Sequence, residues 1–313
     1  MTLVSNNSSW WPVIDWYHQY SYFLVVSSTA LAYDWALSFG QELDLVWRQR
    51  WTFMTVLYIG VRYAGIVSSI LSMLLCFPGV PMTDIVSNII YFIQLWMPFV
   101  AFCMLGVITI NRIYAMYQRS RKILMFLSVT LMAVVTTCGV LIVIINNHVS
   151  VEEAILSGIH QCFFTFEGDL LLPMAVFWVL TAVWEVLALC LAVRVVIMHF
   201  RELQQPSIGW TSEDSITVLI KSHMFYFAVC AILFCLHLGY LFPSLSSSYS
   251  SGSEIYKGIL QISLAQIFVL GPRLILSIRG YYAKRRMVNS DTATAMMTII
   301  FQDQIRDSTG GGV

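Results

Sequence analysis

Charged residues are scarce in this chain. Of its 313 residues only 11% are Asp, Glu, Lys or Arg, whereas 58% are hydrophobic and the mean hydropathy is +0.75. Soluble domains carry about 25% charged residues, so this composition excludes an ordinary soluble protein. Several uncharged runs of about 20 residues or more instead predict helices that cross a membrane.

The chain also lacks an excess of charge of either sign. Lys+Arg and Asp+Glu both number 17, so the formal net charge is zero. We therefore expect no nucleic acid and no strongly charged substrate as a partner. Residues 1–16 lack the basic start and apolar core of a cleavable signal peptide, so the first span is expected to serve as the targeting signal.

Motifs for catalysis and for metal binding are absent as well. The sequence contains no HExxH, no GxSxG and no phosphate-binding glycine loop. Its seven cysteines include no CxxC pair and no Cys/His spacing typical of a structural metal. The last apolar span has no central lysine to form a Schiff base with retinal, because Lys257 lies at its outer mouth. We expect no enzyme, no metal and no cofactor.

What the chain does contain is a series of seven apolar spans. They predict an all-α membrane protein, a receptor-like bundle of seven transmembrane helices within residues 17–278. Segment 1–16 precedes the bundle, and a partly disordered tail, 279–313, follows it. The predicted spans are residues 17–37, 51–77, 85–113, 123–145, 170–198, 222–242 and 255–278.

The segment between the first two spans, 38–50, is amphipathic. Its apolar residues recur at helical spacing from Phe39 to Trp47. Ser38 has the spacing of a helix cap, and Asp44 and Arg48 have that of an ion pair within a helix. These patterns favour a short helix lying in the membrane interface, with an ordinary loop as the alternative.

The distribution of basic residues predicts the orientation. All of the Lys and Arg residues except Arg62, Arg273 and Lys257 fall on one side of the predicted bundle or at the adjoining span ends. The positive-inside rule then places the N-terminus outside and the tail in the cytoplasm, which requires an odd number of spans. We expect a multi-pass protein of the plasma membrane, with an endomembrane as the alternative, and glycosylation sequons at Asn6 and Asn7 on the outer side.

Several fragments occur together along the chain. They are Tyr33-Asp34, QELDLVWRQRW and Arg62-Tyr63, then RIYAMYQRSRK, Glu185 and PRLILSIRGYY. In this combination the chain resembles a large family of uncharacterised seven-span proteins of mushroom-forming basidiomycete fungi, which carry the domain of unknown function numbered 6533. The resemblance implies a seven-helix, receptor-like fold and no established activity. Family members often place an extracellular cysteine near the start of span three, whereas this chain has Cys76 at the end of span two.

Arg62 and Glu185 are the charges that lie deepest in the predicted spans. A charge at the bilayer centre costs at least about 2.5 to 3.5 kcal/mol, so both are expected to face the bundle interior. One interpretation is a polar core that binds a ligand, moves a proton or switches between two packings. The other is a structural tether, in which Arg62 pairs with Asp34. Further candidates for a polar cavity in the outer half are Gln94, His237, Gln261 and Gln266.

Cys76 and Cys162 both fall on the predicted outer side, where the compartment is oxidising. A disulfide between them would contribute about 4 to 5 kcal/mol in the chain-entropy model. Two free thiols are the alternative.

A basic and aromatic stretch follows span three. We interpret it either as a docking face for a cytosolic signalling partner or as a segment attracted to anionic lipid, at about 1 kcal/mol per basic residue. Its candidate residues are Arg112, Tyr114, Arg119, Arg121 and Lys122.

These features favour a receptor-like sensor in a lipid bilayer, with a small-molecule cavity in the outer half of the bundle. A transporter or channel using an Arg62/Glu185 layer is the first alternative. A structural membrane protein without a ligand is the second.

Overall fold

Most of the described chain is helical. The computed structural model describes residues 3–5, 7–77, 83–117, 120–156, 158–168 and 170–203, five single positions between 229 and 239, and residues 255–283 with gaps at 264, 267, 278, 281 and 282. Within these residues, six helices are long and apolar enough to cross a membrane. They are α1 (Trp11–Glu42), α2 (Phe53–Cys76), α3 (Asp84–Met116), α4 (Arg121–Asn147), α5 (Leu171–Leu203) and a helix at Ile255–Ser277, which we call the last helix. The chain is a multi-pass integral membrane protein.

Six of the predicted spans overlap these six helices. The remaining one, 222–242, lies outside the described residues except at single positions. The same holds for most of the predicted tail, 279–313.

Helix α1 begins earlier than the predicted first span. It starts at Trp11, and Pro12 lies in its first turn, where the missing N–H costs no helical hydrogen bond. Segment 1–16, which we predicted to precede the bundle, therefore has secondary structure of its own. It holds the strand β1 (Leu3–Ser5), the 3-10 turn η1 (Ser8–Trp10) and the first residues of α1.

The prediction of a separate interfacial helix at 38–50 is wrong, because α1 continues into this segment. It runs unbroken to Glu42 and passes directly into a π-helical turn, η2 (Leu43–Trp47). Ser38 does not cap a helix, since its hydroxyl donates to the backbone carbonyl of Asp34, 2.5 Å away and one turn earlier. A surface helix and the end of a long span share the same apolar spacing, which is why the sequence pattern misled.

The ion pair expected on this segment is confirmed. Arg48 Nη1 lies 2.8 Å from Asp44 Oδ1, and both side chains are exposed. The two residues lie at and just beyond η2, so the pair spans the π-helical turn. Exposed pairs of this kind stabilise a protein by at most about 1 kcal/mol.

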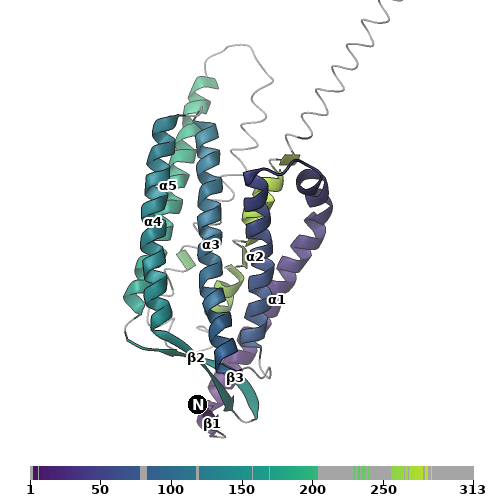
Figure 1. Ribbon diagram of the computed structural model, residues 1–313, viewed down its shortest axis with the longest axis vertical. Coiled ribbons are helices and arrows are strands. Elements are labelled where there is room, and N and C mark those ends of the chain that lie inside the picture. The colour runs from purple at the N-terminus through teal and green to yellow at the C-terminus, as the bar shows by residue number, and fades with distance from the viewer. Residues whose placement is uncertain are drawn as a thin grey trace, which may run out of the picture.

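The helices pack largely in chain order around α3. In Figure 1, α1 and α2 lie on one side of α3, and α4 and α5 lie on the other. One buried cluster joins α3, α4 and α5 to Leu274 of the last helix and includes Leu127, Cys138 and Trp184. A second cluster joins α1, α2, α3 and the last helix and includes Tyr58 and Phe268. The last helix therefore packs beside α1, α2 and α3.

A small sheet covers one end of the bundle, which we call the hairpin end (Figure 1). Strands β2 (Val149–Leu156) and β3 (Ile159–Phe166) form an antiparallel hairpin, and β1 pairs with β2 in parallel. Gly158, with φ of 83°, occupies the turn, a conformation that favours glycine. Among the described residues the fold is thus helical apart from this sheet, in which β2 and β3 come from the segment between α4 and α5 and β1 comes from the start of the chain.

The hairpin is fixed to the helices by hydrogen bonds. The Asn88 side chain on α3 binds both backbone groups of Val151, donating to its carbonyl at 2.7 Å and accepting from its N–H at 3.0 Å. The Tyr17 hydroxyl on α1 donates to the backbone carbonyl of Cys162 at 3.0 Å. The sheet is therefore attached to α1 and α3.

Candidate functional site

Three charged side chains are buried together in the half of the bundle away from the hairpin. Asp34 is 5% exposed, Glu42 0% and Arg62 3%. Arg62 Nε lies 2.9 Å from Glu42 Oε2, and Arg62 Nη1 lies 3.4 Å from Asp34 Oδ2. One guanidinium from α2 therefore faces two carboxylates from α1.

A second arginine joins this group from the last helix. Arg273 Nε forms an ion pair with Asp34 Oδ1. Asp34, Glu42, Arg62 and Arg273 together form what we call the arginine–carboxylate cluster. Its two positive and two negative groups balance in formal charge, which reduces the cost of holding them within apolar spans. The cluster connects α1, α2 and the last helix.

Polar neighbours add hydrogen bonds to the cluster, although Arg62 Nε and Glu42 Oε2 meet only as an ion pair, without a hydrogen bond between them. Arg62 Nη2 donates to the backbone carbonyl of Trp35 at 3.3 Å and to the Ser38 hydroxyl. Glu42 Oε1 accepts from Trp47 Nε1 at 3.2 Å and from the Tyr63 hydroxyl at 3.3 Å. These donors spread the charge of the buried ions over fixed dipoles, so the cluster is well suited to hold helices together.

Arg279 adds a further link just beyond the last helix. Its Nη1 donates to the backbone carbonyl of Leu45 at 3.1 Å, and its Nη2 donates to the Thr55 hydroxyl at 2.9 Å. Burial lowers the pKa of Arg279 from its ordinary value, although the nearby Tyr58 acts in the opposite direction. The end of the last helix is thereby joined to η2 and to the start of α2.

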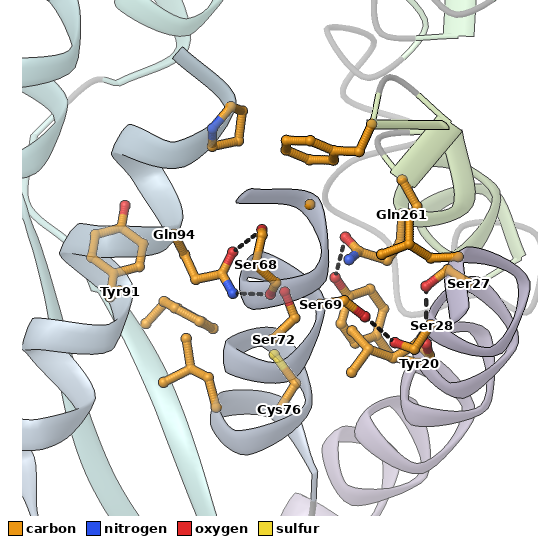
Figure 2. A pocket seen from close by; sticks show the side chains of 18 residues that line it. Tyr20, Ser27, Ser28, Ser68, Ser69, Ser72, Cys76, Tyr91, Gln94 and Gln261 are labelled. Carbon is orange, nitrogen blue, oxygen red and sulfur yellow. Dashed lines mark hydrogen bonds between the residues drawn. The ribbon is translucent and has the colours of Figure 1, made fainter. Parts of the chain in front are cut away.

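A cavity of about 240 Å³ lies between this cluster and the hairpin end. We call it the hydroxyl cavity, because serine and tyrosine hydroxyls from α1 and α2 line it together with two glutamines (Figure 2). Asp, Glu, Lys, Arg and His are absent from its described lining. The lining on α2 runs from Cys76 to Gly65, about 16 Å along the helix axis, which is roughly half of a 30 Å hydrocarbon layer.

Hydrogen bonds link the polar groups of this cavity in pairs. The Tyr20 hydroxyl donates to Gln261 Oε1 at 3.0 Å, which joins α1 to the last helix. The Ser68 hydroxyl donates to Gln94 Oε1 at 3.0 Å, which joins α2 to α3. Figure 2 shows these pairs facing each other across the cavity, from four different helices.

The residues predicted to form one polar core are divided between the hydroxyl cavity, the arginine–carboxylate cluster and other parts of the chain. Gln94 and Gln261 line the hydroxyl cavity, and Arg62 belongs to the arginine–carboxylate cluster. Gln266 lies on the exposed face of the last helix, outside the cavity lining. His237 lies outside the described residues.

Glu185 is not among the ion-pair partners of Arg62. It lies on α5, and its Oε2 is buried without a hydrogen-bond partner among the described residues. The Arg62/Glu185 layer that the sequence suggested is therefore not formed by direct contact.

The disulfide considered between Cys76 and Cys162 is absent from the structure, in which both are free thiols. Both side chains are buried in one apolar cluster with Val151. The Cys162 sulfur lies 3.4 Å from the Ser87 hydroxyl, within hydrogen-bonding distance. Burial raises the pKa of the Cys162 thiol, and this Ser87 contact only partly offsets the rise.

The remaining candidates lie near the two ends of the bundle. Arg112 and Tyr114 are on the last turns of α3, and Arg121 and Lys122 are exposed at the start of α4. Asn7 is exposed just before η1. Asn6 and Arg119 lie outside the part of the chain that the structure describes.

Sequence analysis missed several residues of both sites. Arg273 and Glu42 were not among the candidate site residues that the sequence suggested. The serines of the cavity carried a signal, because polar side chains cluster at helical spacing within two otherwise apolar spans. Those serines are Ser27, Ser28, Ser68, Ser69 and Ser72.

A comparison with protein families finds a match near the start of the chain. The model of a family of unknown function (DUF6533) matches residues 22–67, which covers most of α1, η2 and the first part of α2. This segment supplies Asp34, Glu42 and Arg62, three of the four members of the arginine–carboxylate cluster. No curated protein matches the chain.

Proposed function

We propose that the protein is a receptor-like sensor of the plasma membrane, and a member of the fungal seven-span proteins that carry the DUF6533 domain. A small molecule enters the hydroxyl cavity, and the arginine–carboxylate cluster passes the resulting shift to the cytoplasmic face. On this proposal the protein catalyses no reaction.

The spacing of the two sites along three helices carries the proposal. Leu31 lines the cavity one turn before Asp34 on α1, and Phe268 lines it five residues before Arg273 on the last helix. On α2, Gly65 lines the cavity one turn after Arg62. These intervals correspond to roughly 5 to 8 Å of helix. A molecule that separates the helices at the cavity floor therefore acts directly on the cluster.

Close packing at the cavity floor supports this coupling. A Cβ atom on Gly65 would lie 2.5 Å from the Cβ of Phe268, so α2 and the last helix touch without a gap. Packed helices move as rigid bodies, and small residues at such contacts determine how closely the helices approach. Any displacement of Phe268 is transmitted to the ion pair between Arg273 and Asp34.

The direction of the helices supports seven spans. Helix α5 starts beside the hairpin, where Leu170 packs against Val149. The last helix also starts at this end, since Gln261 binds Tyr20, and it ends near η2, where Arg279 binds Leu45. Two spans of the same direction need a crossing between them, which supports the predicted sixth span at 222–242.

The charges at the two ends support an outer hairpin and a cytoplasmic opposite end. The described end of the bundle away from the hairpin carries Arg48, Arg50, Arg121 and Lys122, all exposed. The hairpin strands carry glutamates and no Lys or Arg. This asymmetry agrees with the positive-inside rule. It presents the basic side chains near α3 and α4 to a cytosolic signalling partner.

Filling the cavity by mutation tests the coupling without any ligand. Ser72 lines the cavity, so Ser72→Met adds bulk there. Hydrogen exchange measured in lipid nanodiscs is expected to accelerate about threefold or more in the backbone of 43–48, a local loss of roughly 0.7 kcal/mol. Ile70→Met on the same helix is the control, because Ile70 is 53% exposed to the lipid side.

Other outcomes would favour the alternatives. Unchanged exchange at 43–48 in a folded Ser72→Met protein would contradict the sensor and leave the cluster as a static tether of a structural protein. A transporter would be favoured if reconstituted vesicles show a flux of protons or solute and the substitution Glu185→Gln abolishes this flux.

A further inference from the structure

We propose that the ligand of the hydroxyl cavity is an uncharged alcohol or phenol with an apolar body and about ten non-hydrogen atoms. This proposal rests on the proposed function, because it names the ligand class of the same cavity. It follows from three properties of the lining: the absence of charge, the use of its hydroxyl donors, and its size.

The lining excludes a charged ligand. The described wall holds no Asp, Glu, Lys, Arg or His that would pair with an ammonium or a carboxylate. A cavity that reaches about halfway across the hydrocarbon layer leaves such a charge poorly solvated. The ions of the arginine–carboxylate cluster are already paired with one another.

Of the seven hydroxyls in the described cavity lining, those of Tyr20, Ser27, Ser68 and Ser69 donate their protons to protein acceptors. The Ser69 hydroxyl donates to Ser28 Oγ at 2.7 Å, and the Ser27 hydroxyl donates to the backbone carbonyl of Leu24 at 2.9 Å. The hydroxyls of Tyr20 and Ser68 donate to the two glutamine carbonyls in the same way. A hydroxyl has one proton but two lone pairs. What these groups offer to a ligand is therefore acceptor capacity.

Pro98 leaves another acceptor, the backbone carbonyl of Gln94, without its helical partner. It lies within α3 and lines the cavity, and it has no N–H to bind the carbonyl of Gln94 one turn earlier. The side-chain amide of Gln94 donates to the backbone carbonyl of Ser68. A ligand that donates a hydrogen bond fits this surface better than one that only accepts.

An alcohol satisfies these requirements in both directions. Its proton binds one of the acceptor oxygens, and its oxygen can accept from the side-chain amide of Gln261, whose carbonyl is held by Tyr20. The apolar remainder packs against Leu24, Leu31 and Phe268, which line the same cavity. An apolar cavity of about 150 Å³ holds benzene, with six non-hydrogen atoms, so this cavity has room for about ten.

Photolabelling provides the test. The full chain in nanodiscs is irradiated with 3-azioctanol, an octanol that carries a diazirine, and the adducts are located by mass spectrometry. We expect adducts on cavity residues such as Tyr20 and Tyr91. Competition by 1-octanol is expected to exceed that by 1-methoxyheptane, which has the same formula but no hydrogen-bond donor, by about 3- to 10-fold.

Variants separate this proposal from the sensor. Ser72→Met is expected to abolish labelling in the cavity, and Ile70→Met is expected to retain it. If Ser72→Met fails to fold, the competition series on the unmodified chain decides. Equal competition by the ether, stronger competition by octylammonium, or adducts spread over lipid-facing residues would each overturn the ligand class. Labelling as expected without faster exchange at 43–48 would overturn the sensor alone.

Discussion

At the scale of single residues, two carboxylates stabilise the buried charge of Arg62. It lies near Asp34 and Glu42 and is 3% exposed. Removing one partner of a buried ion pair leaves an uncompensated charge and typically costs about 3 to 5 kcal/mol, whereas an exposed pair contributes at most about 1 kcal/mol. The position of a salt bridge thus matters more than its presence.

Arg62→Ala is therefore expected to destabilise the protein strongly. It leaves the two carboxylates with only Arg273 as a charged partner, so about 3 kcal/mol or more should be lost. Thermal unfolding in nanodiscs and the amount of protein in the membrane measure the effect.

Arg48→Ala is the matched control for this experiment. It removes an arginine that lies 2.8 Å from its partner Asp44, in an ion pair of similar geometry. The Arg48 side chain is 78% exposed. Its expected effect is below about 1 kcal/mol. Equal effects of the two substitutions would contradict a stabilising role for the buried cluster.

At the scale of elements, the hairpin is a cover attached to the helices by side-chain hydrogen bonds and by buried apolar side chains. Asn88 makes two hydrogen bonds to Val151, and the side chain of Cys162 on β3 is buried in an apolar cluster with Cys76. Because the Cys162 thiol is buried, its reaction with a reagent in solution reports how often the hairpin opens.

Cys162 is expected to react slowly with iodoacetamide at pH 8 in the folded protein. Burial and the nearby carboxylates of Glu153 and Asp84 raise its pKa, so little thiolate is present below that pKa and the rate should increase as the pH rises. Asn88→Ala removes both hydrogen bonds to the hairpin and should accelerate alkylation about tenfold.

The control for the hairpin is Asn147→Ala, an exposed asparagine at the end of α4. Its alkylation rate should match that of the unmodified chain. Fast alkylation of Cys162 in the unmodified chain, with no dependence on Asn88, would show that the cover is open in the membrane. Mass spectrometry of the peptide that contains Cys162 gives the rates.

Sequence patterns recovered the elements better than their connections. Long apolar runs gave the six described spans because hydropathy is a property of each segment alone. The π-helical end of α1 and the hairpin escaped, because both depend on partners far away in the chain. Glu42 looks like a surface residue until Arg62 is placed beside it, and Asn88 shows no relation to Val151 before folding.

At the scale of the whole molecule, the parallel course of α5 and the last helix predicts where each loop lies. Added cysteines at Glu152 and at Ser248 should react with a membrane-impermeant maleimide on intact cells. Cysteines at Gln49 and at Ser207 should react only after permeabilisation. If Ser248→Cys and Gln49→Cys react on the same side of the membrane, the predicted sixth span and the seven-helix topology are contradicted.

The strand β1 imposes an order on assembly. Its residues pair with Ala154–Leu156, roughly 150 residues later in the chain. At a synthesis rate of about 5 to 20 residues per second, the N-terminal segment waits roughly 8 to 30 seconds for its partner strand. The hairpin end is therefore completed only after α1 to α4 have been made.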